Sequence, residues 1–367
     1  MSEQLTARAA IFEPGANVAV FEDVHVGPLR DDEVLVKLVA TGICHTDLSY
    51  RGRLQIPVVL GHEGAGHVVK VGSAVTKVKP GDPVVLSFLS CGRCPSCEAY
   101  KPAYCATFRV LNQSGGRADG SSALSRDGSP VGAHFFGQSS FATYSVANER
   151  NVVKAPKDAP LELLGPLGCG VQTGAGAVMN VLRPNAGDSL LVIGAGGVGM
   201  SALMAAVAEG CFPVVVVEPN AARRELALDL GAAAAIDPIN EDVTARILEV
   251  VREGVRWVVD TSGRADVIAK VVEGMGSRGG VALVAASPSD AVLAVPILSI
   301  LRRGLAIHGV IEGDSDPEVF IPRLIELVMQ GRFPLEKLVK FYQLDELNQA
   351  IEDQHRGAVI KPIIRMA

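Results

Sequence analysis

The second half of the chain alternates short apolar segments with helix-forming segments, and this alternation restricts the fold more than any other feature. SLLVI (189–193) predicts a buried strand, GAGGVG (194–199) a tight glycine turn, and the following MSALMAAVAEG a helix. PVVVV and NAARRELALDLGA repeat the strand and the helix, and VRWVVD and GGVALVAA are further strand candidates. Strands that alternate with helices of this length predict a parallel sheet with crossover connections.

Up to about residue 170 the pattern is different, because short strands are separated by glycine and proline turns. The strand candidates are ARAAIF, DEVLVKLVA, GHVVKVG and DPVVLS, with turn signals such as KPGD between them. We therefore expect a mostly antiparallel β domain, with an exposed loop over the Gly-, Ser- and Asp-rich residues 112–132. After about residue 310 an amphipathic helix near PEVFIPRLIELVMQG and a final helix and strand follow. A chain of 367 residues is long enough for two domains.

Composition excludes several classes of protein. Hydrophobic residues make up 48% of the chain and charged residues 20%, as in a large globular enzyme and unlike a disordered or fibrous protein. The formal charge of −6 and the lack of a basic run make nucleic acid and a membrane surface poor partners. The N-terminal MSEQLTARAAIFEPG lacks the apolar segment of a signal peptide, and no apolar run is long enough to cross a membrane. We expect a cytoplasmic protein.

The glycine turn has the spacing G-x-G-x-x-G, formed by Gly194, Gly196 and Gly199. A strand candidate precedes it, a helix candidate follows it, and Glu218 closes the next strand. Glycines at these positions let the backbone approach a pyrophosphate, whose charge rests at the helix N-terminus. The turn therefore predicts a dinucleotide site in which Glu218 accepts hydrogen bonds from the ribose hydroxyls, and a purely structural turn is the alternative.

The acid at position 218 also bears on the choice of dinucleotide. A carboxylate repels a 2′-phosphate and pairs with free ribose hydroxyls, which favours NAD over NADP. Arg223 and Arg224 follow closely and weaken this preference, because arginines can accept that phosphate. We expect NAD as the cofactor, and we place Gly197 and Val198 with the three spaced glycines in its binding turn.

Four of the seven cysteines lie within fifteen residues, as C-x2-C-x2-C-x7-C. A disulfide knot is the weakest explanation, because the cysteine number is odd and no export signal is present. Four thiolates can surround one tetrahedral ion and leave no open position, which predicts a structural zinc site. An iron–sulfur cluster is the competing explanation. The candidate ligands are Cys91, Cys94, Cys97 and Cys105.

A second set of candidate metal ligands is scattered along the chain. Cys44 lies in GICHTD, His62 and Glu63 lie in LGHEGAG, and Cys169 lies in PLGCGVQTG. One histidine and two cysteines are the ligands of a catalytic zinc that keeps its fourth position open. Spacing alone does not establish the set, because Cys169 is more than one hundred residues from His62 and a lone cysteine is usually a small core residue.

All of these motifs occur in the order found in one family. GICHTD, GHEGAGHVVKVG with the following PGDPVV, the four-cysteine segment, PLGCGVQTGAG and IGAGGVG resemble the zinc-dependent alcohol dehydrogenases of the medium-chain dehydrogenase/reductase family. The similarity covers essentially the whole chain. The run GVIEGDS…FIPRLIELVMQGRFPLEKLVKFY is most similar to the aryl-alcohol (benzyl-alcohol) dehydrogenase branch.

The resemblance implies an α/β fold, with a GroES-like catalytic domain over 1–170 and 310–367 and a Rossmann domain over 171–309. It implies hydride transfer between a primary, aromatic or allylic, alcohol and NAD, giving the aldehyde. It further implies two zinc ions per chain, one catalytic and one structural, and a homodimer or homotetramer.

Site residues are carried over from the family by motif. The resemblance makes Cys44, His62 and Cys169 the catalytic zinc ligands, Glu63 a carboxylate that coordinates transiently, and Asp47 the residue that orients His62. It assigns Thr46 to taking the proton from the alcohol, His45 and Lys361 to the cofactor pyrophosphate, and Arg223 to the adenosine ribose. It places Phe135 and Phe136 in the substrate pocket, with Phe88 and Ala286 as weaker candidates.

The chain departs from the family pattern at Ser49, and two alternative functions are open. Ser49 stands where many relatives have a histidine that ends the proton relay, so that base is absent. Arg109 falls where glutathione-dependent formaldehyde dehydrogenases bind the glutathione carboxylate, but RGRLQIPVVLG lacks the acidic residue that those enzymes have there. The other alternative is an inactive, zinc-stabilised structural or binding protein, which the intact Cys44, Thr46, His62 and Cys169 argue against.

Overall fold

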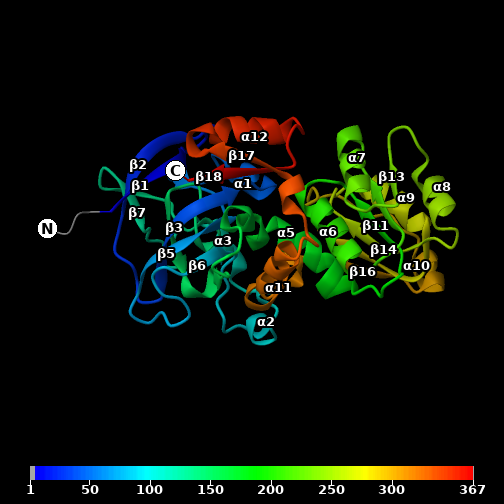
Figure 1. The fold of residues 1–367 in the computed structure, drawn as a ribbon, viewed down its shortest axis with the longest axis horizontal. Helices are drawn as coiled ribbons and strands as arrows, with labels where there is room; N and C mark the ends of the chain where they lie inside the picture. The colour runs from blue at the N-terminus through cyan, green and yellow to red at the C-terminus, as the bar shows by residue number, and fades with distance from the viewer. Residues whose placement is uncertain (1–4, 367) are drawn as a thin grey trace. The chain divides into compact units, whose positions relative to one another are not determined.

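The structure, a computed structural model, describes residues 5–366, which divide into two compact units. The first unit contains residues 5–169 and 316–366, and the second is Gly170–Ser315. The divisions expected from the sequence, after residues 170 and 309, lie one and six residues from these limits. Figure 1 shows the elements of both units.

Two sheets form the described part of the first unit. The five-stranded sheet has the order β4-β1-β2-β7-β8 with all neighbours antiparallel, and consists of β1 (Thr6–Phe12), β2 (Val20–Val26), β4 (Val58–Val59), β7 (Leu124–Arg126) and β8 (Ser129–Val131). The other sheet has the order β10-β6-β5-β3-β18-β17, with β9 also paired to β3, and only β17 and β18 run parallel. Its strands are β3 (Glu33–Gly42), β5 (Gly64–Val71), β6 (Pro83–Leu86), β9 (Tyr144–Asn148), β10 (Val152–Lys154), β17 (Val339–Gln343) and β18 (Lys361–Arg365).

The expected antiparallel domain is confirmed, but the loop expected over 112–132 is wrong in part. Strands β7 and β8 form a hairpin within it, and Leu124 pairs with Val131. Both side chains are buried, so two apolar residues anchor a segment that is otherwise polar.

Short helices connect the strands of the first unit, and two longer helices follow Asp316. They are α1 (His45–Tyr50), α2 (Pro95–Glu98), α3 (Phe108–Gln113), α4 (Leu161–Leu164), α11 (Pro317–Met329) and α12 (Leu347–His355), with 3-10 turns η1 (Pro102–Tyr104), η2 (Phe135–Gly137), η3 (Glu149–Asn151), η4 (Gly165–Gly168), η7 (Leu335–Lys337) and η8 (Leu344–Glu346). Helix α11 begins where Asp316 caps it and Pro317 takes the first position.

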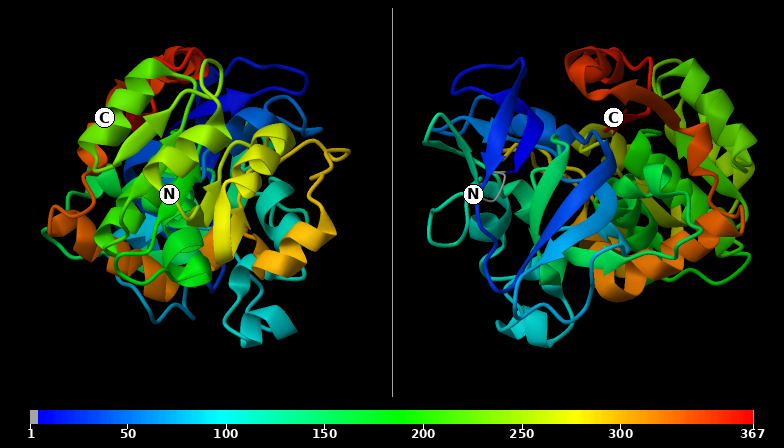
Figure 2. Two further views of the ribbon diagram at one scale, coloured as in Figure 1. Left: turned by 90° about the vertical axis from the view of Figure 1, so that its right-hand side faces the viewer. Right: turned by 60° about the vertical axis from the view of Figure 1, so that its left-hand side comes forward.

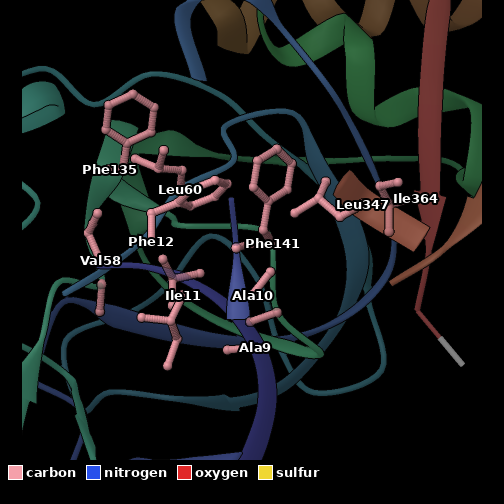
Figure 3. Close-up of a cluster of buried hydrophobic side chains, with 14 of the residues drawn as sticks. Ala9, Ala10, Ile11, Phe12, Val58, Leu60, Phe135, Phe141, Leu347 and Ile364 are labelled. Carbon is pink, nitrogen blue, oxygen red and sulfur yellow. The ribbon is translucent and has the colours of Figure 1, made fainter. Parts of the chain in front are cut away.

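The core of the first unit joins residues from both ends of the chain. Ile11 from β1 and Phe141 pack in one buried cluster with Leu347 from α12 and Ile364 from β18, as Figure 3 shows. The last fifty residues are therefore part of the same core as the first strand, which is why the unit contains both ends of the chain.

The second unit is built on a six-stranded parallel sheet with the order β13-β12-β11-β14-β15-β16. Its elements are α5 (Gly170–Gly176), the π-helical turn η5 (Ala177–Leu182), β11 (Leu190–Ile193), α6 (Gly197–Ala208), β12 (Val214–Val217), α7 (Ala221–Asp229), β13 (Ala234–Ile236), α8 (Val243–Val250), β14 (Val255–Asp260), α9 (Ala265–Glu273), β15 (Met275–Leu283), α10 (Ile297–Arg303), β16 (Ala306–Gly309) and the 3-10 turn η6 (Glu312–Asp314). Counted within the unit, the strand order is 3-2-1-4-5-6, the doubly wound order of dinucleotide-binding domains.

Helices cover both faces of the parallel sheet, as Figure 2 shows. Because both faces are covered, the strands are continuous apolar runs such as LLVI in β11 and VVVV in β12. The order reverses between β11 and β14, and the glycine turn lies at the carboxyl end of β11, where ligands of such sheets bind. No helix within residues 5–366 has the length and apolar character needed to span a membrane.

Candidate active site

The structure brings together Cys44, His62 and Cys169, whose ligand atoms all lie within 4.8 Å of one another. Cys44 caps α1 just after β3, His62 lies just before β5, and Cys169 follows η4. All three are within the first unit. Three separate segments thus supply one set of metal-ligand atoms, and Cys169 comes from far along the chain.

Asp47 determines how the His62 ring is turned. Its carboxylate accepts the His62 Nδ1–H at 2.6 Å and also the backbone N–H groups of Cys44 (2.9 Å) and Gly61 (3.0 Å). In the neutral ring that a metal binds, Nδ1 keeps this proton and the lone pair is on Nε2, which is buried without a hydrogen-bond partner. A buried acceptor without a partner, next to two thiols, fits a metal ion, and the three donors leave one coordination position free.

The charges around this set shift the pKa values of two of the ligands. A hydrogen bond from Cys169, with the nearby charges of His62 and Lys361, holds the pKa of the Cys44 thiol well below its usual value. Burial disfavours a charged His62, but the negative charges of Asp47 and Cys44 outweigh it and raise the pKa of the ring well above its usual value. The two shifts have a common cause, because the thiolate of Cys44 and the positively charged ring of His62 stabilise each other.

Glu63 is completely buried beside these ligands and is paired with Lys361. The Lys361 Nζ donates to both carboxylate oxygens, at 2.8 and 3.0 Å, and to the carbonyl oxygen of Ile43 at 3.1 Å. A Cβ on Gly42 would lie only 2.1 Å from Glu63 Oε2, so a larger residue at the end of β3 would displace the Glu63 carboxylate. Lys361, expected at the cofactor pyrophosphate, contacts Glu63 here, and its contact with a cofactor stays a prediction.

Aromatic rings pack around His62. Phe136 stacks on the His62 ring, with centroids 4.3 Å apart, and Phe135 meets it edge-on at 5.6 Å. Tyr50, which the sequence analysis did not select, contacts Phe135 at 5.2 Å. Both phenylalanines are buried, so in this structure they support the histidine, and their contact with a substrate stays a prediction.

The other two pocket candidates belong to different units of the chain. Phe88 is buried and packs against Phe108, another ring that the sequence analysis did not select, at 5.7 Å. Ala286 belongs to the second unit and is exposed after β15.

The four clustered cysteines form the second metal-ligand set. Their sulfurs all lie within 4.8 Å of one another, with Cys94 and Cys97 3.5 Å apart and Cys91 and Cys97 4.0 Å apart. These distances are far too long for the 2.05 Å of a disulfide. Sulfurs placed 2.3 Å from one tetrahedral ion are about 3.8 Å apart, close to what is seen.

In the glycine turn of the second unit, the fold requires glycine at two of the three spaced positions but not at the third. Gly194 has a φ of +90°, and a Cβ on Gly199 would lie 1.8 Å from the Gly194 carbonyl oxygen, so the fold itself requires both. Gly196 has an ordinary φ of −79°, and a Cβ there would meet nothing within 4 Å. No side chain caps the N-terminus of α6. The space above Gly196 and the open helix N-terminus fit a pyrophosphate.

Glu218 lies directly after β12, where a ribose would be bound. Its carboxylate accepts the backbone N–H groups of Ala195 at 2.7 Å and Asn220 at 2.9 Å. The Arg224 guanidinium donates to the Glu218 and Pro219 carbonyl oxygens and pairs with Asp237. Arg224 is therefore engaged within the protein.

Two expected cofactor contacts, Arg223 and His45, lie in different units. Arg223, on α7, has a buried Nε without a hydrogen-bond partner. His45 is exposed at the first position of α1, and Thr46 follows it.

Comparison with known proteins identifies the family. Residues 30–157 match the model of the alcohol dehydrogenase GroES-like domain, and residues 197–330 match that of the zinc-binding dehydrogenase domain. The chain is 44% identical to geraniol dehydrogenase from Castellaniella defragrans, over 98% of each chain.

Two solved structures match the whole chain. An alcohol dehydrogenase zinc-binding domain protein from Burkholderia ambifaria is 45% identical, with a TM-score of 0.97 and all of both chains covered. Benzyl alcohol dehydrogenase from Acinetobacter calcoaceticus is 42% identical, with a TM-score of 0.94 and 99% of this chain and 100% of that one covered. The chain belongs to the zinc-dependent alcohol dehydrogenases of the medium-chain dehydrogenase/reductase family.

Proposed function

We propose that this protein is an NAD-dependent zinc alcohol dehydrogenase that interconverts primary aromatic or allylic alcohols and their aldehydes. The observation that carries the proposal is the ligand set of Cys44, His62 and Cys169, in which the unpartnered His62 Nε2 faces two thiols and one coordination position is free for a substrate. A zinc ion held there supplies Lewis acidity, which makes an alcohol hydroxyl easier to deprotonate near neutral pH.

The chain's own residues position the groups and move the proton. With NAD⁺ bound, the alcohol would give a hydride from its carbinol carbon to the cofactor. The Thr46 hydroxyl, two residues after Cys44 on α1, would accept the alcohol proton while passing its own proton on. Ser49 follows on the same helix, and its hydroxyl donates to the Thr46 carbonyl oxygen at 2.8 Å. Serine does not titrate near neutral pH, so the proton leaves through water or through the exposed His45.

We assign zinc to both ligand sets. The four sulfurs of the cysteine cluster lie close enough together for one ion, whereas an iron–sulfur cluster places several metal and sulfide ions between its thiolates. With all four positions taken by protein, this ion would stabilise the loop and take no part in catalysis. Metal analysis of the purified protein should give two zinc ions per chain and no iron.

NAD is favoured over NADP by the surroundings of Glu218. The carboxylate lies where the ribose hydroxyls would bind, and the Arg224 guanidinium is engaged by two carbonyl oxygens and Asp237. Arg223 is the residue that favours NADP, because its buried Nε has no hydrogen-bond partner within the described part of the protein. The ratio of kcat/KM for NAD and NADP tests the assignment, and a higher value with NADP contradicts it.

The substrate class rests on the two relatives, one named for benzyl alcohol and one for geraniol, an aromatic and an allylic alcohol. A hollow of about 570 Å³ lies next to the rings around His62, since Tyr50 both lines it and contacts Phe135. The hollow is open to solvent, so it would cover only part of a bound substrate. Arg53 and Arg109 also line it.

Arg109 supports a second candidate function, oxidation of S-(hydroxymethyl)glutathione. Arg109 matches the glutathione-binding arginine of formaldehyde dehydrogenases and so favours S-(hydroxymethyl)glutathione as substrate. Against this, Arg53 belongs to the stretch RGRLQIPVVLG, which lacks the acidic residue that those enzymes have there. NADH formation at 340 nm with benzyl alcohol, with geraniol and with S-(hydroxymethyl)glutathione separates the candidates. Turnover of only the glutathione adduct contradicts our proposal, and no turnover of any alcohol by zinc-loaded protein indicates an inactive member of the family.

We also propose that the protein is a homo-oligomer. Strand β16 is at the edge of the parallel sheet, and Ile307 on it is exposed, as are Ile297 and Leu301 on α10. An edge strand beside exposed apolar side chains is suited to pairing with another chain. Light scattering after size-exclusion chromatography should give a dimer or tetramer, and a monomer contradicts this.

A further inference from the structure

Three consecutive polar residues, Gln138, Ser139 and Ser140, are buried beside the segment that carries His62. Their exposed fractions are 0%, 1% and 0%. Burying polar side chains is costly unless each finds hydrogen-bond partners, so three in a row indicate a specific task.

The Gln138 amide holds the chain on both sides of Glu63. Its Nε2 donates to the carbonyl oxygen of His62 at 2.9 Å, and its Oε1 accepts the N–H of Gly64 at 3.0 Å. The second N–H of the amide reaches the carbonyl oxygen of Ser87 at 3.1 Å. One side chain therefore fixes the backbone of the histidine segment and ties it to the end of β6.

The two serines attach the same segment at further points. The Ser139 hydroxyl donates to the Val59 carbonyl oxygen, and the Ser140 N–H donates to that of Gly61 at 2.9 Å. A Cβ on Gly64 would lie 2.8 Å from the Ser140 Cβ and 3.1 Å from Gln138 Oε1, so the two segments are in close contact.

A further hydrogen bond extends this connection to the third ligand. The Ser87 hydroxyl donates at 2.8 Å to the carbonyl oxygen of Gly168, the residue before Cys169. His62 is thus linked through Gln138 and Ser87 to the segment of Cys169, although neither linking residue is a ligand in the set.

We propose that Gln138 is a positioning residue that, with Ser87, holds His62 and Cys169 in the relative placement that a bound metal requires. The inference rests on the proposed zinc at this site. Without the amide, the histidine segment can shift relative to Cys169, and the coordination geometry becomes less well defined. Residues that orient metal ligands typically change metal affinity by about 10- to 100-fold when they are replaced.

The test replaces Gln138 by methionine, which has a similar shape but none of the three hydrogen bonds. Asn112→Leu is the matched control. Asn112 is also a fully buried amide with three hydrogen bonds, but its partners are the backbone groups of Leu89 and Phe108. Both variants and the wild type are metal-depleted, loaded with Co²⁺ at both sites, and compared by visible spectrum and by the half-time of metal loss to a chelator.

We expect Gln138→Met to shift the visible bands of the His62 site and to lose that ion about 10- to 100-fold faster, while Asn112→Leu leaves both unchanged. Should Gln138→Met fail to fold, Ser87→Ala removes one hydroxyl of the same connection and should shift the same bands. The proposal is overturned if the folded Gln138→Met, or Ser87→Ala in its place, matches the wild type within twofold, or if Asn112→Leu shows the same change. Wild type that takes up only one Co²⁺ per chain overturns the zinc assignment itself.

Discussion

Gly196→Ala separates the needs of the fold from those of the cofactor. Its φ of −79° suits alanine, and the new methyl group would meet no protein atom within 4 Å. We therefore expect the free energy of unfolding to stay the same or to rise by about 0.4–1 kcal/mol, because alanine restricts the unfolded chain. Gly199→Ala is the contrast, since its methyl group would lie 1.8 Å from the Gly194 carbonyl oxygen and should cost about 1–3 kcal/mol or more.

Binding of the dinucleotide should respond in the opposite way. If the pyrophosphate rests on the turn, the Gly196→Ala methyl group occupies its space, and overpacking of this kind costs about 1–3 kcal/mol. At 1.4 kcal/mol per tenfold, NADH should bind roughly 5- to 150-fold more weakly. NADH fluorescence titration measures the affinity, and urea unfolding of the same samples measures the stability. Wild-type affinity in Gly196→Ala, or a stability loss equal to that of Gly199→Ala, would refute the reasoning.

Three further predictions concern single side chains. Asp47→Asn should weaken zinc binding about 10- to 100-fold, because the amide accepts fewer of the three hydrogen bonds. Asp82→Asn should leave zinc binding unchanged, because this buried carboxylate pairs with Lys154 and with the Lys79 N–H, and chelator competition checks both variants. Ser49→His should add an ionisation between about pH 6 and 8 to the pH profile of kcat, and an unchanged profile where hydride transfer limits turnover contradicts this. Burial lowers the pKa of His134 to about 4, whereas a histidine in the unfolded chain has a pKa of about 6.5. Between these two pH values the unfolded chain binds more protons than the folded chain. The free energy of unfolding therefore falls as the pH drops from about 6.5 to about 4. His134→Phe should remove about 2 kcal/mol of the loss between pH 7.5 and 5, measured by urea unfolding.

Much of the fold could be predicted from local patterns. The parallel sheet follows from strand and helix segments that alternate, and the contact that requires glycine at 199 is with Gly194 in the same short loop. The hairpin of β7 and β8 was missed because composition over 112–132 is dominated by Gly, Ser and Asp. The two apolar residues that anchor it, Leu124 and Val131, are too few to make a periodic pattern.

Of the two metal-ligand sets, one could be predicted from spacing alone and the other could not. Cys91, Cys94, Cys97 and Cys105 are near in sequence, so their spacing alone indicated a common site. Cys169 is joined to Cys44 and His62 only by the tertiary fold, and the resemblance to a family supplied what spacing could not.

Gln138 shows a more general limit, because its partners are backbone atoms. The carbonyl oxygen of His62, that of Ser87 and the N–H of Gly64 exist whatever side chains those residues carry, so no residue type in the sequence marks them as partners. The available signal is in the segment itself: FFGQSSF places three polar residues between phenylalanines, where the neighbours on both sides are buried. Since a buried polar side chain has to be satisfied, such an interruption predicts that the chain passes close to another backbone segment. It does not say which one. Only the fold shows that the neighbouring backbone segment is the one that carries His62, a metal ligand.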